Sequence, residues 1–267
     1  MIAIGIAAWC LSEKGPDSLA QVAKVGLNHA QVDFGFPGAS NYLGHPEEIQ
    51  VLCRASADSG VAIIGLGVRA LNDVGMTRSH ESEAARRIDE ICSSAVEATA
   101  LLGARLVFFP SFRASAIMDA EGLQRTAGVL KRACQLAAPH RLQVCSENGL
   151  DVAGNQRLVD AVDEPNFRIL LDSYNPVIFG HRPVDLLEKL GDRVARQIHI
   201  KDGQGGKVGD ARLGKGDGEV LETLAAVRLS GAADFLILEN DYRNDVRSRV
   251  ARDCVVIDHL FRSGSSA

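Results

Sequence analysis

Four side chains of metal-ligand type stand at the ends of four successive apolar runs in the second half of the chain. The runs LQVCSE, FRILLD, RQIHI and FLILE end at or near Glu147, Asp172, His199 and Glu239. These residues are separated by 25, 27 and 40 positions, and a strand, a helix and their two loops take about 30 residues. Neighbouring parallel strands end at one edge of a sheet, so the four groups can converge. Two glutamates, an aspartate and a histidine suit one divalent cation.

Each of these residues also has an ordinary structural explanation when taken alone. Glu147 can cap a helix or pair with an arginine, and Asp172 can close a turn through its own backbone. His199 lies in an apolar strand, where most histidines are hydrogen-bonded core groups. Strand alternation, however, puts His199 on one face with Gln197 and Lys201, a polar row that a barrel tolerates near its mouth. The occurrence of all four on consecutive strands favours a shared site.

The elements that must position these groups alternate along the whole chain. Eight apolar runs are typical of strands covered by helices on both sides. They span residues 2–8, 29–34, 62–68, 105–109, 142–146, 168–171, 196–200 and 235–238. Helical patterns follow them at 18–26, 47–59, 79–102, 120–138, 155–162, 184–190, 218–230 and 244–261. A chain of 267 residues matches the roughly 250 of one closed barrel.

The predicted fold is therefore α/β, a single-domain (β/α)8 TIM barrel over residues 1–262, with a disordered tail at 263–267. The loops that follow strands are the long ones, and barrel enzymes build their sites from such loops. Residues 71–78 and 204–216 are glycine-rich or polar, which predicts mobile lids.

Composition excludes several classes of partner. The net charge is −5 without runs of like charge, which argues against a nucleic-acid surface and a polybasic membrane anchor. No apolar stretch reaches the roughly 20 residues of a transmembrane helix. The apolar N-terminus lacks a basic leader, so we expect a first strand there. Six scattered cysteines without a CxxC pair indicate reduced thiols and a cytoplasmic location.

Several motifs carry a family resemblance. The segments SENG, LLDSYNP, IHIKDG followed by RLGKGDG, and LILEND resemble the xylose-isomerase-like TIM-barrel family of sugar and sugar phosphate isomerases and epimerases. That family includes tagatose 3-epimerase, hydroxypyruvate isomerase and inosose dehydratase. The resemblance covers about residues 143–241 and the barrel pattern. It implies one Mn, Mg, Co or Zn ion on Glu147, Asp172, His199 and Glu239, with both glutamates as the acid/base pair on opposite substrate faces.

The chain departs from the family pattern at two positions. Asn175 stands where many epimerases have a histidine three residues after the strand-six aspartate, which alters the usual contact to a substrate oxygen. Asp33 alone represents the acidic residue often found after strand two.

We expect five side chains to contact substrate, namely Arg212, Asn175, Lys201, Arg69 and Trp9. Arg212 is equally well explained as a solvated loop arginine, and Trp9 as a core plug. Lys201 can instead pair with Asp202 to hold its loop.

The resemblance implies a metal-dependent isomerase or epimerase of a ketose, sugar phosphate or small hydroxy-ketone, acting by proton abstraction next to a carbonyl through an ene-diolate. The alternative is a lyase of inosose- or dehydroshikimate-dehydratase type. An AP-endonuclease-like hydrolase is disfavoured by the few strand-end histidines and the negative charge. A non-catalytic sugar-binding barrel is disfavoured because it would be free to lose the four ligands. The expected partner is a small sugar or polyol, with a homodimer or homotetramer as expected assemblies.

Overall fold

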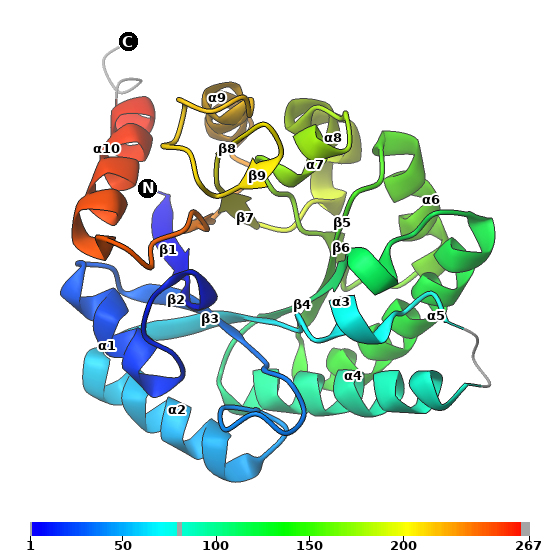
Figure 1. Ribbon diagram of the computed structural model, residues 1–267. Helices are drawn as coiled ribbons and strands as arrows, with labels where there is room; N and C mark the ends of the chain where they lie inside the picture. The colour runs from blue at the N-terminus through cyan, green and yellow to red at the C-terminus, as the bar shows by residue number, and fades with distance from the viewer. Residues whose placement is uncertain (1, 79–81, 263–267) are drawn as a thin grey trace.

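Eight parallel strands curl into one sheet in the computed structural model, which describes residues 2–78 and 82–262. The strands are β1 (Ala3–Ala7), β2 (His29–Asp33), β3 (Ala62–Gly67), β4 (Leu106–Ser111), β5 (Gln143–Asn148), β6 (Phe167–Ile169), β7 (Gln197–Ile200) and β10 (Phe235–Leu238). Their order is β6-β5-β4-β3-β2-β1-β10-β7. Isolated parallel bridges Ile169–Val194 and Asp172–His199 join the two ends. The sheet therefore closes, and the predicted TIM barrel is confirmed (Figure 1).

Helices surround the barrel on all sides (Figure 1). They are α1 (Pro16–Lys24), α2 (Pro46–Ser59), α3 (Leu71–Val74), α4 (Glu83–Leu101), α5 (Ala120–Ala137), α6 (Val152–Val162), α7 (Asn175–Ile178), α8 (Pro183–Leu190), α9 (Val220–Ser230) and α10 (Val246–Arg262). Four 3-10 turns are η1 (Ala8–Cys10), η2 (Arg113–Ser115), η3 (Ala138–His140) and η4 (Gly191–Arg193). A small hairpin, β8 (Gly203–Gln204) with β9 (Lys207–Val208), follows β7.

Side-chain caps set several helix starts. The Asp151 carboxylate accepts a hydrogen bond from the Gly154 amide, so α6 begins at Val152, three residues before the predicted start. Ser82 caps α4 in the same way. The predicted start of this helix at residue 79 and the predicted tail at 263–267 lie outside the described residues.

The barrel interior has an apolar layer below a polar one. Leu106, Phe108, Cys145, Leu170 and Ala195 form a buried cluster against which Trp9 packs. The Phe108 ring lies 5.2 Å from the His199 ring, edge to face. Phe108 and Trp9 thus give one side of the site an aromatic surface against His199.

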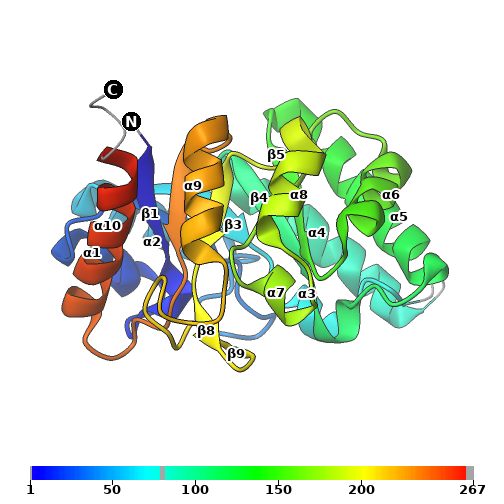
Figure 2. The same cartoon turned by 90° about the horizontal axis from the view of Figure 1, so that it is seen from above.

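The long loops gather at the carboxyl ends of the strands. Figure 2 shows α3, α7 and the β8–β9 hairpin along one edge of the molecule, with the start of β1 and the end of α10 toward the opposite edge. The two segments predicted as lids are anchored: Leu71 and Met76 are buried, and Asp202 holds the second segment through backbone amides. Their motion stays a prediction.

No helix among the described residues combines the length and apolar character needed to cross a membrane.

Candidate metal centre and active site

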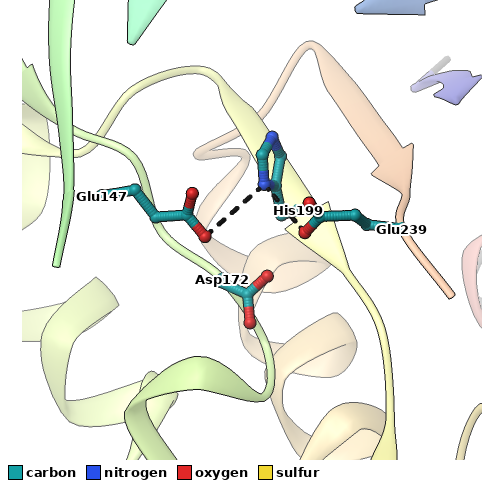
Figure 3. Close-up of side chains that lie close together, drawn as sticks. All are labelled: Glu147, Asp172, His199 and Glu239. Atoms are coloured by element: carbon teal, nitrogen blue, oxygen red, sulfur yellow. Dashed lines mark ion pairs between the residues drawn. The ribbon is translucent and has the colours of Figure 1, made fainter. Parts of the chain in front are cut away.

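The four predicted ligands converge at the carboxyl ends of β5, β6, β7 and β10. One ligand atom from each of Glu147, Asp172, His199 and Glu239 lies within 4.8 Å of the others. Figure 3 shows Glu147 and Glu239 approaching from opposite sides, with His199 between them. His199 Nδ1 is 3.1 Å from Glu239 Oε2 and 3.8 Å from Glu147 Oε1. Asp172 and His199 also face each other across a bridge that closes the barrel.

The two carboxylate oxygens of Asp172 have different surroundings. Oδ1 accepts hydrogen bonds from the backbone amides of Tyr174 at 2.7 Å and Asn175 at 2.6 Å. This is the turn expected of an aspartate at a strand end, and it fixes the carboxylate. Oδ2 is left to face the cluster, so the turn-forming role and the proposed ligand role use different atoms of the same side chain.

The cluster contains buried polar atoms that lie against charged groups without meeting the geometry of a hydrogen bond. Among the described residues, His199 Nδ1 and Asp172 Oδ2 have no hydrogen-bond partner, although charged groups lie within 3.1 Å of each. A bound ion with bonds of about 2.0–2.2 Å would place opposite ligand atoms up to about 4.4 Å apart. The observed spread is close to that value, so these residues fit a single divalent cation.

The buried amine of Lys201 is the positive charge that the carboxylates of Asp172 and Glu239 contact. Its Nζ is 2.7 Å from Glu239 Oε2 and 3.0 Å from Asp172 Oδ2. Burial opposes its charged form, but Asp172 and Glu239 outweigh burial and raise the pKa of Lys201. Lys201 thus orients two candidate ligands, and sequence spacing alone did not predict this role.

The buried charges shift one another strongly. Burial would lower the pKa of His199, but the carboxylates of Glu239 and Glu147 raise it to about 10. Burial raises the pKa of Asp172 to about 6, against the opposing effect of Lys201. Burial opposes ionisation of Glu239 as well, yet Lys201 and His199 hold the pKa of Glu239 well below its usual range. The cluster is therefore a strong binding environment for cations, including the proton on His199.

A cavity of about 130 Å³ opens beside the cluster. Its lining residues are Trp9, Arg69, Asn72, Phe108, Pro110, Phe112, Glu147, Asn175, Lys201 and Glu239. One part of this wall is aromatic and the other is charged or amide-bearing, an arrangement suited to a small polar ligand with an apolar face. A second cavity of about 170 Å³ shares Trp9 and Arg69 with it.

Four of the five predicted substrate contacts line this cavity. Trp9 Nε1 donates to Glu239 Oε1 at 2.9 Å, so Trp9 is more than a core plug. Asn175 Nδ2 donates to Glu147 Oε1 at 2.6 Å. Arg69 Nη1 lies 3.4 Å from Asp33 Oδ2, and its guanidinium is 5.7 Å from the Trp9 ring centroid. Arg212 is exposed and is absent from the lining residues, so its substrate contact stays a prediction.

Asp202 holds the glycine-rich loop through backbone amides, whereas Lys201, its alternative partner in the sequence analysis, pairs with Asp172 and Glu239. Its carboxylate accepts hydrogen bonds from the amides of Gly203, Gly214, Gly216 and Gly218 at 2.9–3.2 Å. A Cβ on Gly216 would lie 2.0 Å from the Gly203 carbonyl oxygen. Gly216 of RLGKGDG is therefore required by this close approach of backbone to backbone.

Sequence reasoning missed Asn72, Phe108 and Phe112 in the cavity wall, and Gln31 behind His199. Gln31 carried a usable signal, because a glutamine within the apolar strand HAQVD is unusual in a barrel interior.

A closed barrel of eight parallel strands with three carboxylates and a histidine converging at its mouth defines a TIM-barrel protein with a candidate metal centre. The chain belongs to the xylose isomerase-like TIM barrel family, whose model matches residues 19–254. It is 37% identical over 251 residues to a 2-epi-5-epi-valiolone 7-phosphate 2-epimerase of Actinoplanes sp., covering 94% of this chain and 91% of that one.

Solved structures share the fold at low sequence identity. A D-tagatose 3-epimerase-like protein matches with TM-score 0.82 and 16% identity over 98% of this chain and 99% of that chain. An L-ribulose 3-epimerase matches with TM-score 0.79 and 18% identity, over 98% and 95%. The IOLI protein with a binding zinc atom matches with TM-score 0.76 and 14% identity, over 100% of both chains.

Proposed function

We propose that this protein is a metal-dependent epimerase or isomerase of a polyhydroxylated carbonyl compound. The reaction removes a proton next to the carbonyl and passes through an ene-diolate. The observation that carries the proposal is the approach of Glu147 and Glu239 to one centre from opposite sides (Figure 3). A planar intermediate between them would present one face to each carboxylate. The named activity of the Actinoplanes relative supports this reaction class.

Glu147, Asp172, His199 and Glu239 would hold one divalent ion. Three carboxylates and one imidazole suit manganese, magnesium, cobalt or zinc, and we expect manganese to support activity. When bound, the ion polarises the substrate carbonyl and its neighbouring hydroxyl, which lowers the pKa of the C–H between them. The convergence of Nδ1 of His199 and Oδ2 of Asp172 on the cluster, where both atoms are buried, supports this assignment.

The chain's own residues would move the proton and orient the carboxylates. One glutamate accepts the proton from carbon and the other returns a proton on the opposite face, each contributing about 10²–10⁴-fold. Lys201 and Trp9 each hold one oxygen of Glu239, and Asn175 holds Glu147. Arg69 would contact a substrate oxygen from the cavity wall.

The substrate class proposed is a ketose, its phosphate, or a cyclic polyol ketone, which places the protein in carbohydrate metabolism. A screen of ketoses, ketose phosphates and inososes with added Mn²⁺ and product analysis tests it. Formation of an epimer or isomer supports the proposal. Loss of water from the substrate would establish the dehydratase alternative instead, and absence of any product across the panel with a metal-loaded protein would contradict both.

We place the protein in the cytoplasm, because all six cysteines are free and unpaired thiols fit a reducing compartment. Assembly into a homodimer or homotetramer stays a prediction.

A further inference from the structure

A line of buried amides crosses the barrel interior behind His199. Gln31 on β2 is fully buried and Gln197 on β7 is 7% exposed. His199 Nε2 lies 2.7 Å from Gln31 Oε1, Gln31 Nε2 is 2.8 Å from Gln197 Oε1, and Gln197 Nε2 is 2.8 Å from the Ile64 carbonyl oxygen. Barrel interiors are usually filled by branched apolar side chains. Buried amides are tolerated only where their hydrogen bonds are made. A line of buried amides in a barrel interior therefore suggests a specific role.

The line has a fixed direction. The Ile64 carbonyl can only accept, so the Gln197 amide nitrogen must face it and Oε1 must face away. Gln31 then presents its nitrogen to that oxygen. Its own oxygen is left for His199, and an oxygen of this kind can only accept. His199 Nε2 must therefore carry a proton.

The backbone is shaped to admit this line. The pairing of β2 with β3 slips between Ala30 and Gln31, which pair with Ile63 and Gly65. Ile64 is the extra residue of this bulge, and its carbonyl receives Gln197. A Cβ on Gly65 would lie 3.1 Å from Gln31 Cγ and 3.2 Å from Gln197 Oε1. The bulge supplies the terminal acceptor, and the glycine leaves room for both amides.

We propose that Gln31 and Gln197 are positioning residues that keep a proton on Nε2 of His199, so that Nδ1, which faces Glu147 and Glu239, is the nitrogen that binds a cation once the cation has displaced the Nδ1 proton. A neutral imidazole has one N–H and one lone pair, and the partner of one nitrogen decides which form is present. Only the form enforced here offers Nδ1 to a divalent cation. The inference rests on the proposed metal site and adds two residues on which its affinity depends.

The test uses Gln31→Met and Gln197→Met, which keep length and remove the amide. Competition with a chelating dye measures the affinity of each purified protein for Mn²⁺ and Zn²⁺. Gln31→Met should bind about 10–100-fold more weakly, as for other residues that orient a ligand histidine. Gln197→Met should also lose affinity, because Gln31 can then turn over and offer its nitrogen to Nε2. The loss should be smaller than in Gln31→Met, because the original orientation of Gln31 stays accessible. Gln31→Glu keeps an acceptor for Nε2–H but removes the donor to Gln197 Oε1, so it should bind metal more tightly than Gln31→Met.

Thr99→Val is the matched control, since Thr99 is buried and bonds only the Ala95 carbonyl within α4. It should bind metal as wild type does. If Gln31→Met proves unstable, Gly65→Ala takes its place. The added methyl group crowds the side chains of Gln31 and Gln197, so this variant should also weaken metal binding.

A second readout is independent of affinity. Nitrogen-15 NMR of the zinc-loaded, histidine-labelled wild type should show a proton on Nε2 of His199 and none on Nδ1, assigned against His199→Ala. Wild-type affinity in Gln31→Met, or a proton on Nδ1 in the loaded wild type, would overturn the inference. Equal metal binding by wild type and His199→Ala would instead refute the proposed metal site itself.

Discussion

Individual side chains at the barrel mouth serve structure with one atom and the site with another. Asp172 forms a turn through Oδ1 and faces the cluster through Oδ2. His199 bonds Gln31 through Nε2 and faces the carboxylates through Nδ1. The ordinary structural role and the proposed ligand role of each residue therefore use different atoms and are compatible, which is why sequence alone could not choose between them one residue at a time.

Glu147→Gln and Glu239→Gln test the proposed acid/base pair. Each variant keeps the size of the side chain and removes its basicity, so kcat should fall by about 10²-fold or more. KM should change less, because the aromatic wall and Arg69 are retained. Steady-state kinetics at saturating Mn²⁺ measure both. Metal content must be determined alongside, and a fully loaded variant with undiminished kcat would remove that glutamate from the chemistry.

Metal affinity should rise with pH up to about pH 10. The carboxylates hold a proton on His199 with a pKa of about 10, and a cation must displace that proton. Titrations between pH 6 and 9 should show the rise, whereas affinity independent of pH would exclude His199 as a ligand.

The metal-free protein should respond to pH in the opposite sense. The folded pKa of His199 is raised above its usual 6.5, so its contribution to stability is complete below pH 6.5 and is lost as pH rises toward 10. The pKa of Asp172, raised from 3.8 to about 6, acts with the same sign at lower pH. The melting temperature of wild type should fall from pH 6.5 to 9 relative to that of His199→Gln. A constant difference would contradict the assigned proton.

At the scale of elements, the alternation of apolar runs predicted all eight barrel strands and the strand ends that carry the ligands. The short helices α3 and α7 were not predicted, because each has four residues, too few to show a helical period. The β8–β9 hairpin was not predicted either. Spacing could assign Lys201 to the mouth but could not reveal that its amine pairs with Asp172 and Glu239. Which groups the Lys201 amine contacts depends on side-chain rotamers and on neighbours distant in sequence.

The loop after β7 should loosen in Asp202→Asn. The carboxylate accepts four amide hydrogen bonds, whereas an asparagine offers one acceptor oxygen and turns an NH₂ toward the remaining amides. Hydrogen exchange by mass spectrometry should show faster exchange at residues 214–218, with a loss of about 1–3 kcal/mol in unfolding free energy. Asp217→Asn serves as comparison, because this neighbouring, exposed carboxylate accepts from the Gly205 amide and the Tyr174 hydroxyl rather than from the amides that Asp202 holds. Unchanged exchange in Asp202→Asn would show that the loop does not depend on it.

For the whole molecule, the candidate ligands lie across the junction between β6 and β7, where the barrel is closed by the fewest strand pairings. Strands β6 and β7 meet only through isolated bridges in the described chain, and Asp172 and His199 lie at one of them. An ion bound by residues of β5, β7 and β10 and of the segment after β6 would stabilise this junction. Ligand at 100 times its Kd adds about 2.7 kcal/mol of stability, equivalent to roughly 5–10 °C for a chain of this size. Calorimetry with Mn²⁺ should show this rise in wild type and not in His199→Ala, and equal rises would place binding elsewhere.

The central claim is that two glutamates exchange a proton at a carbon next to a carbonyl. Turnover of an identified substrate in deuterated water tests it most directly, with the product analysed by NMR. We predict deuterium at the carbon whose configuration or oxidation state changes, and loss of this incorporation in Glu147→Gln and Glu239→Gln. Product formed at the wild-type rate, with the original hydrogen retained on the substrate skeleton in every turnover, would contradict the claim and indicate a hydride shift between carbons.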